Sequence, residues 1–151
     1  MEIERKFTIS KLPEDLDTYP CHHIEQGYLS TNPVVRIRRQ DEEYILTYKG
    51  SGMMVRTEYN LPLTRESYEH MKPKADGVVI TKKRYNIPFG KYTVELDVFE
   101  EELKGLIIAE VEFATKEEAE QFCPPDWFEK DVTFSKEYHN SYLAMNTPRK
   151  Y

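Results

Sequence analysis

The sequence predicts an α+β fold in which an eight-stranded antiparallel sheet closes into a barrel and a few helices cover it. Most of the chain consists of short segments rich in Val, Ile, Tyr, Phe and Thr, in which apolar and polar residues alternate. Helical patterns are few and fall mostly in the last third of the chain. We expect closure because an open sheet of this kind would leave two exposed edges, which a barrel removes.

The eight strand patterns are separated by Gly and Pro residues at the places where turns are expected. Within each segment the side chains alternate between two faces, as they do in a strand with two different surroundings. In chain order the predicted strands are Glu2 to Ile9, Glu25 to Ser30, Val34 to Gln40, Glu43 to Lys49, Val55 to Leu63, Val78 to Ile87, Lys91 to Phe99 and Leu106 to Phe113.

Helical patterns occupy three segments between or after these strands. They cover Thr64 to Met71, Glu117 to Phe122 and Lys136 to Met145. Thr115 and Glu118 form a capping box at the start of the second helix. In the third, Tyr138, Tyr142 and Met145 recur at helical spacing, which predicts that they form its buried face.

The length of 151 residues fits one domain, and no linker or internal repeat divides residues 1–151. Charged residues make up 32% of the chain and hydrophobic residues 39%, so charge is expected beyond the outer surface. A net charge of -6 argues against a protein that coats nucleic acid. No apolar run is long enough for a membrane span and no signal peptide is visible, which predicts a cytoplasmic protein.

The two cysteines, Cys21 and Cys123, are far apart in the sequence and match no metal or redox motif. We expect both to be reduced and half-buried. The four histidines show no spacing typical of metal ligands, and none is assigned to a site.

Charged residues recur at every second position of several predicted strands, so each set projects from one face. These sets are Glu2, Glu4 and Lys6; Arg36 and Arg38; Arg56 and Glu58; Lys82 and Arg84; Glu95 and Asp97; and Glu110 and Glu112. Lys49 shares its face with Thr47, and the intervening positions are largely apolar.

Two interpretations fit this alternation. Each pair taken alone is typical of the solvated outer face of an antiparallel sheet. The whole set draws so heavily on Arg and carboxylates that a barrel with a charged interior explains it better, because Arg suits planar phosphate recognition. In that barrel the apolar positions would face outward beneath the helices.

A lumen with both charges can bind a polyanion and divalent cations together. Lys and Arg neutralise phosphates, and carboxylates bind hard cations through oxygen. Glu2 and Glu4 on the first strand could bind one or two metal ions with Glu110 and Glu112 on the last strand, if closure brings the two strands together. Lys6 shares the face of the first two glutamates and would reach the phosphates.

Glu2-x-Glu4-x-Lys6 near the start of the chain resembles the signature of the CYTH superfamily, the triphosphate tunnel metalloenzymes. Further matching segments follow in the family's order over nearly the full length. They are Val35-Arg36-Ile37-Arg38, Leu46-Thr47-Tyr48-Lys49-Gly50, Lys82-Lys83-Arg84-Tyr85, Glu95-Leu96-Asp97-Val98-Phe99-Glu100, Gly105-Leu106, Ala109-Glu110-Val111-Glu112-Phe113, Val132-Thr133 and Tyr138-x-Asn140.

The resemblance implies an eight-stranded antiparallel tunnel that binds a triphosphate and depends on Mg²⁺ or Mn²⁺. The implied metal ligands are Glu2, Glu4, Glu110 and Glu112. The implied phosphate-binding residues are Lys6, Arg36, Arg38, Lys49, Lys82 and Arg84. The expected catalytic group consists of Glu2, Glu4, Lys6 and Glu112. Three more residues share the tunnel-facing side: Arg56 as a further phosphate contact, and Glu58 and Asp97 as supporting carboxylates. Lys136 is either a phosphate contact at a lid or a solvent-exposed lysine.

Hydrolysis of a small triphosphate is the expected function, with inorganic tripolyphosphate as first choice and nucleoside triphosphates as further substrates. Adenylate cyclase and thiamine triphosphatase are alternatives on the same fold. A non-catalytic polyphosphate or nucleotide-binding module is an alternative of another class, as is a surface-charged barrel with an interaction role. The expected partner is a small-molecule triphosphate rather than a nucleic-acid polymer or a membrane, and a homodimer is one possible assembly.

Overall fold

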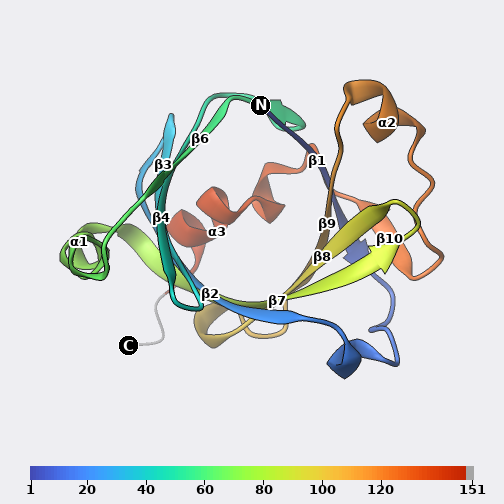
Figure 1. Ribbon diagram of the computed structural model, residues 1–151, viewed down its shortest axis with the longest axis horizontal. Coiled ribbons are helices and arrows are strands. Elements are labelled where there is room, and N and C mark those ends of the chain that lie inside the picture. Colours follow the sequence, from blue (N-terminus) through green and yellow to red (C-terminus); the bar gives the residue numbers. More distant parts are fainter. Residues whose placement is uncertain (149–151) are drawn as a thin grey trace.

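The computed structural model describes residues 1–148, which form an antiparallel barrel around an open interior (Figure 1). Its strands are β1 (Glu2–Ile9), β2 (Cys21–Thr31), β3 (Val34–Gln40), β4 (Glu43–Lys49), β5 (Val55–Arg56), β6 (Glu58–Pro62), β7 (Asp76–Phe89), β8 (Tyr92–Phe99), β9 (Ile107–Glu112) and β10 (Phe128–Asp131). The α-helices are α1 (Arg65–Met71), α2 (Lys116–Gln121) and α3 (Asn140–Asn146). Short 3₁₀ turns are η1 (Leu16–Thr18), η2 (Lys72–Lys74), η3 (Glu101–Leu103) and η4 (Lys136–Tyr138).

The sheet runs in the order β10-β1-β9-β8-β7-β2-β3-β4-β6, and the segment that contains β5 and β6 joins its two sides. β6 pairs with β4, with Lys49 opposite Glu58. β5, two residues earlier, pairs with β1, with Glu2 opposite Arg56. The barrel therefore closes through one short stretch of chain, and the first strand comes to lie beside β5 on one side and β9 on the other.

The prediction of a closed antiparallel barrel is confirmed, but the structure has ten strands where the sequence predicted eight. The predicted strand from Val55 to Leu63 is split at Thr57, because its two parts pair with different neighbours. β10 was missed because Phe128–Asp131 has no apolar alternation; only its pairing with the second half of β1 makes it a strand. The β1, β3 and β4 boundaries match the predicted ones.

Much of the hydrophobic core lies outside the barrel wall. Phe7, Leu96 and Val111 on β1, β8 and β9 are buried beneath α2 and the segment that follows it, where Phe122 packs with Phe7 and Phe113 at ring distances of 6.1 and 5.2 Å. This confirms the expectation that apolar positions face outward beneath helices. The cover is incomplete, since Tyr48, Tyr59 and Leu61 on the outer side of β4 and β6 are exposed.

The segment from η4 to α3 crosses one end of the barrel, where it is visible through the ring in Figure 1. Ala144 is buried against Tyr28, Val34 and Ile80 of the barrel wall. The predicted single helix from Lys136 to Met145 is broken at His139, whose backbone is extended. Of its predicted buried face, Tyr138 packs against the core, but Tyr142 and Met145 are exposed and Ala144 is buried instead.

Three further expectations concern surface properties. Cys21 and Cys123 are free thiols, as predicted, but both are exposed rather than half-buried. Each lies at an element end where few side chains cover it, Cys21 opening β2 and Cys123 following α2. Among residues 1–148, none of the helices has the length and apolar character that crossing a membrane requires.

Candidate active site: the charged tunnel

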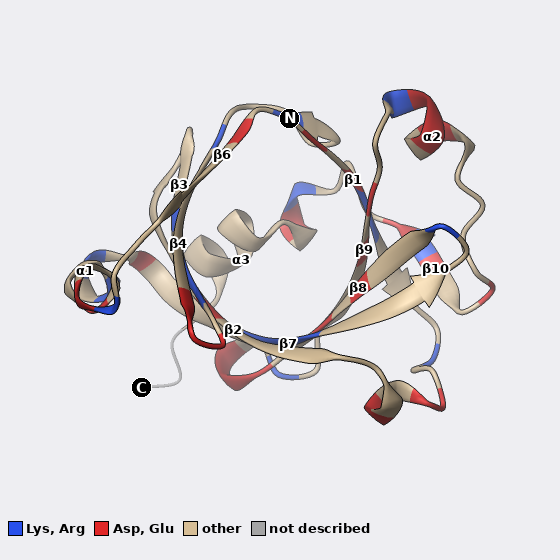
Figure 2. Ribbon diagram, in the orientation of Figure 1, with Lys and Arg blue, Asp and Glu red and all other residues tan. Residues whose placement is uncertain are grey.

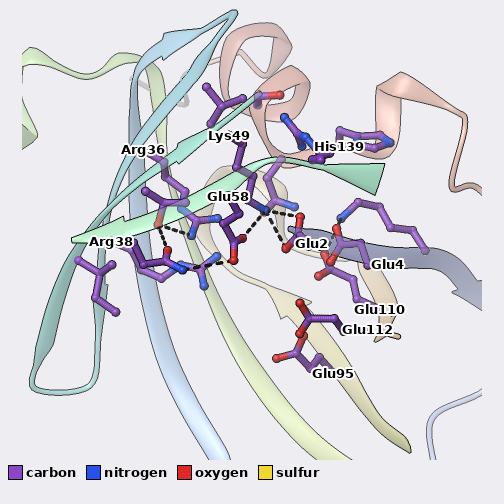
Figure 3. Close-up of a pocket in the computed structure, with 18 of the residues that line it drawn as sticks. Glu2, Glu4, Arg36, Arg38, Lys49, Glu58, Glu95, Glu110, Glu112 and His139 are labelled. Carbon is purple, nitrogen blue, oxygen red and sulfur yellow. Dashed lines mark hydrogen bonds and ion pairs between the residues drawn. The ribbon is translucent and has the colours of Figure 1, made fainter. Parts of the chain in front are cut away.

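Charged positions recur along the strands of the barrel (Figure 2). Their side chains line a cavity of about 310 Å³ inside it (Figure 3). Glu2, Glu4, Lys6 and Lys82 are all at most 7% exposed, which excludes the solvated outer-face interpretation. The sequence-predicted residues that line the cavity are Glu2, Glu4, Lys6, Arg36, Arg38, Lys49, Arg56, Glu58, Lys82, Arg84, Glu110 and Glu112. Asp97 lies behind this surface, and Lys136 lies outside it.

Lysines hold the buried carboxylates of β1 and β9. Lys6 Nζ is 2.7 Å from Glu110 Oε1 and 3.3 Å from Glu4 Oε1. Burial alone would raise the pKa of Glu110, but Lys6 and Arg84 hold it well below its usual range. On the other side of β1, Lys49 Nζ donates to both oxygens of Glu2 at 2.9 and 3.1 Å. Carboxylates on β1 and on β9 are thus each paired with a lysine that is a phosphate-binding candidate.

Asp97 supports two of the predicted phosphate-binding residues from behind. It is fully buried, and it accepts a bidentate pair from Arg84, with Nε–Oδ1 at 2.7 Å and Nη2–Oδ2 at 2.9 Å. Lys82 Nζ lies 2.7 Å from Asp97 Oδ2. Asp97 therefore contacts the basic groups from behind the cavity surface and does not line the cavity itself.

Two arginines on β3 have no carboxylate partner within the described part of the chain. Arg36 Nη2 donates to Thr47 Oγ1 at 3.1 Å, while its Nε is buried with no hydrogen-bond partner. Arg38 Nε donates to Gln26 Oε1 at 2.8 Å. Burial, together with Arg36 and Arg84, lowers the pKa of Arg38 to about 9. Arg36 is buried and Arg38 is partly buried, and cations removed from water without counter-charges are expensive, so this wall of the tunnel is prepared for an anion.

A chain of hydrogen bonds connects Arg38 on β3 with Lys82 on β7. Gln26, which is fully buried, accepts from Arg38 and donates through Nε2 to Asn140 Oδ1 at 3.1 Å. The same Asn140 oxygen accepts from Lys82 Nζ at 2.9 Å. The start of α3 thereby fixes side chains from β2, β3 and β7 in one arrangement.

Glu112 lies at the end of β9 and, among residues 1–148, has no cation within ion-pair distance. Figure 3 shows it pointing into the space that it shares with Glu95, Glu4 and Glu2. Partial burial raises the pKa of Glu112 to about 7, with Glu2, Glu95, Glu4 and Glu58 adding to the effect. Carboxylates are therefore crowded at this end of β9, and Glu112 lies among them without a described cationic partner of its own.

Comparison with known proteins identifies the family. A model of the CYTH domain matches residues 1–143. The chain belongs to the CYTH domain family. It is 38% identical to an inorganic triphosphatase of Nitrosomonas europaea over 97% of this chain and 99% of that protein, and 34% identical to an inorganic triphosphatase of Acetivibrio thermocellus over 96% and 94%. A crystal structure of an inorganic triphosphatase superposes with a TM-score of 0.73 at 34% identity, covering 98% of this chain and 97% of that one.

Several residues that line the tunnel of this CYTH domain received no role from the sequence. Strand alternation placed Glu95 on the face of Asp97 without giving it a role, and Asn60, two positions after Glu58, could have been identified in the same way. His139, Asn140 and Ser141 come from the segment across the barrel end, which no local pattern places there. His139 Nε2 is 2.8 Å from the carbonyl oxygen of Thr133, and burial and Lys6 lower its pKa.

Lys136 does not line the tunnel of the CYTH domain. Its side chain is exposed, in agreement with the solvent-exposed alternative, and it borders a neighbouring hollow that shares Arg56, His139 and Ser141 with the tunnel.

Lys82 should couple anion binding to proton uptake in this CYTH domain. Burial lowers the pKa of Lys82 to about 7; Arg84 and Arg38 act in the same direction and Asp97 opposes them. Since the unfolded value is 10.5, the unfolded chain binds more protons between about pH 7 and 10.5, and this contribution to stability rises with pH across that window. A triphosphate beside Lys82 would restore its charge.

Calorimetric titration of metal-free protein with tripolyphosphate at pH 8, in two buffers of different ionisation enthalpy, measures this uptake. We expect up to about one proton per bound ligand from Lys82. The variant Lys82→Met should take up correspondingly fewer protons, while Lys130→Met, an exposed lysine on β10, should match the wild type. Equal uptake by all three proteins would show that Lys82 is already charged.

Proposed function

We propose that this chain hydrolyses a small triphosphate, with inorganic tripolyphosphate as its substrate, using divalent cations bound in the tunnel. The triphosphatase activity expected from the sequence agrees with the names of the two curated relatives, both inorganic triphosphatases that align over nearly the whole chain. The observation that carries the proposal is that, in the described part of the chain, the tunnel has one side with unpaired arginines and another with an unpaired carboxylate. Within residues 1–148, Arg36 and Arg38 have no carboxylate partner, while Glu112 has no cationic partner.

The charge balance of the tunnel supports a role for metal ions. Among the described residues, seven basic side chains line it, and six glutamates line it with Asp97 behind them. The lumen is thus close to neutral by itself, so a bound triphosphate would leave it strongly negative unless cations enter as well. Carboxylate oxygens are the donors that Mg²⁺ and Mn²⁺ prefer, and the crowded Glu112, Glu2 and Glu4 fit one or two such ions.

No three potential ligand side chains among residues 1–148 already form a closed metal site. Lys49 holds Glu2, and Lys6 holds Glu110 and contacts Glu4. We propose that a triphosphate draws these lysines toward its oxygens, which frees carboxylate oxygens for the cations. Substrate and metal would then bind together more tightly than either alone.

The side chains of the tunnel have separate roles in this proposal. Arg36 and Arg38 hold phosphate oxygens, and Lys6, Lys82 and Arg84 compensate the charge that spreads over the transferring phosphoryl group. Asp97, Gln26 and Asn140 keep these groups oriented. A bound Mg²⁺ or Mn²⁺ would supply Lewis acidity and lower the pKa of a coordinated water. Because these groups are fixed in a closed barrel, little reorganisation accompanies the reaction.

Product analysis tests the proposal. Purified protein is incubated with Mg²⁺ or Mn²⁺ and, in separate reactions, tripolyphosphate, ATP and thiamine triphosphate. We expect metal-dependent release of orthophosphate, fastest from tripolyphosphate. Cyclic AMP with pyrophosphate as products of ATP would indicate an adenylate cyclase. Fastest turnover of thiamine triphosphate would indicate a thiamine triphosphatase. Binding without turnover of any of the three would contradict catalysis and leave a binding module.

A further inference from the structure

A second hollow adjoins the tunnel at the end covered by α3. Its volume is about 300 Å³, and besides its junction residues it is lined by Thr31, Met53, Lys136, Tyr142, Met145 and Asn146. We call this hollow the annex. Arg56, His139 and Ser141 line both the tunnel and the annex, so the two spaces meet at these side chains.

Several apolar side chains that line the annex are exposed to solvent. Met53, Tyr142 and Met145 are 36%, 36% and 47% exposed, and they come from two segments far apart in the sequence. Solvent-exposed apolar side chains that gather around one hollow mark a binding surface more often than those scattered singly. Methionine and tyrosine offer polarisable, adaptable contact to flat aromatic groups.

The charges of the annex differ from those of the tunnel. Arg56 and Lys136 are basic, and none of the residues that line the annex is acidic. Asn146 and Thr31 add an amide and a hydroxyl, which can donate to and accept from a heterocycle. The annex therefore suits a ligand that is flat and weakly polar at one end and anionic where it meets Arg56.

We propose that the annex binds the nucleoside part of a nucleoside triphosphate whose phosphates lie in the tunnel. The base would contact Tyr142, Met53 and Met145, and Arg56 would face the phosphate that carries the sugar. This inference rests on the proposed triphosphatase function and deepens it, because inorganic tripolyphosphate has no group to fill the annex. The annex then determines how well nucleotides are used relative to inorganic substrate.

The variant Tyr142→Ala/Met145→Ala tests the proposal, with tripolyphosphate as an internal control for folding and chemistry. Neither side chain lines the tunnel, and both are substantially exposed. We expect kcat/KM for ATP to fall about tenfold, mainly through KM, since truncating an aromatic contact to a base typically costs that much. The value for tripolyphosphate should stay within about twofold. Tyr59→Ala, an exposed tyrosine on the outer side of β6, is the matched control and should change neither.

Equal losses with both substrates, or an unchanged value for ATP, would overturn the annex as a nucleoside site. So would a wild-type enzyme that cleaves tripolyphosphate and neither cleaves nor binds ATP. Calorimetric binding of the β,γ-imido analogue of ATP separates this inference from the proposed function. If the protein hydrolyses nothing, the proposed function fails, while tenfold weaker analogue binding by the variant would still support the annex. If a longer polyphosphate chain bound more tightly than the analogue, and did so through Lys136, the annex would be assigned to phosphate instead.

Discussion

Replacing Asp97 by asparagine should lower the free energy of unfolding by roughly 3 kcal/mol, because it leaves the buried Arg84 guanidinium without its bidentate counter-charge and takes a carboxylate partner from Lys82. Asp97 is fully buried and contacts both Arg84, in a bidentate pair, and Lys82. Asparagine has nearly the same shape, so the change isolates charge from packing. The midpoint of thermal unfolding should fall by about 6–12 °C, which differential scanning calorimetry measures.

Added tripolyphosphate should narrow the difference in unfolding midpoint between Asp97→Asn and the wild type, since an anion bound beside Lys82 and Arg84 stabilises the folded state of the variant. The matched control is Asp126→Asn, because Asp126 is exposed and its substitution should change stability by at most about 0.5 kcal/mol. If Asp97→Asn is as mild as the control, then Glu95 and Glu110 suffice to balance Arg84, and Asp97 is not the support that the geometry indicates.

Strand alternation made most of the tunnel predictable from sequence. Once Glu2 and Glu4 face one side of β1, Lys6 must share that side, and the same parity places Arg36 with Arg38 and Lys82 with Arg84. Buried charge in a sheet is otherwise rare, so its repetition over several strands indicated a common interior. The same logic had already placed Glu95 beside Asp97, and it extends to Asn60, which shares the face of Glu58.

Long-range pairing accounts for what the sequence could not show. The split at Thr57 follows from β5 reaching β1, which is far from this segment in the chain, while β6 stays on the preceding strand β4. Asn140 enters the site because α3 packs on β7 and β2, and its partners Gln26 and Lys82 lie more than fifty residues away. Local patterns carry no information about such contacts.

Replacing Glu112 by glutamine should reduce kcat for tripolyphosphate at a fixed, subsaturating Mg²⁺ or Mn²⁺ concentration about 100-fold, a loss typical of removing one preorganised electrostatic group. The reason is the position of Glu112 among Glu2, Glu4, Glu58 and Glu95, with no described cation to offset it. Metal titrations of the activity should show half-saturation at a correspondingly higher concentration. Metal-free binding of tripolyphosphate, measured by calorimetry, should be unchanged or tighter, because a negative charge has been removed from the tunnel.

Stability distinguishes this effect from a damaged fold. Without metal, Glu112→Gln should unfold at the same temperature as the wild type or a higher one, since the substitution relieves repulsion among carboxylates. Glu129→Gln, an exposed glutamate on β10, should leave both metal dependence and stability unchanged. If Glu112→Gln retained the wild-type metal titration, the uncompensated charge at the end of β9 would have no part in cation binding. The paired carboxylates of Glu2, Glu4 and Glu110 would then have to provide the site alone, in competition with Lys6 and Lys49.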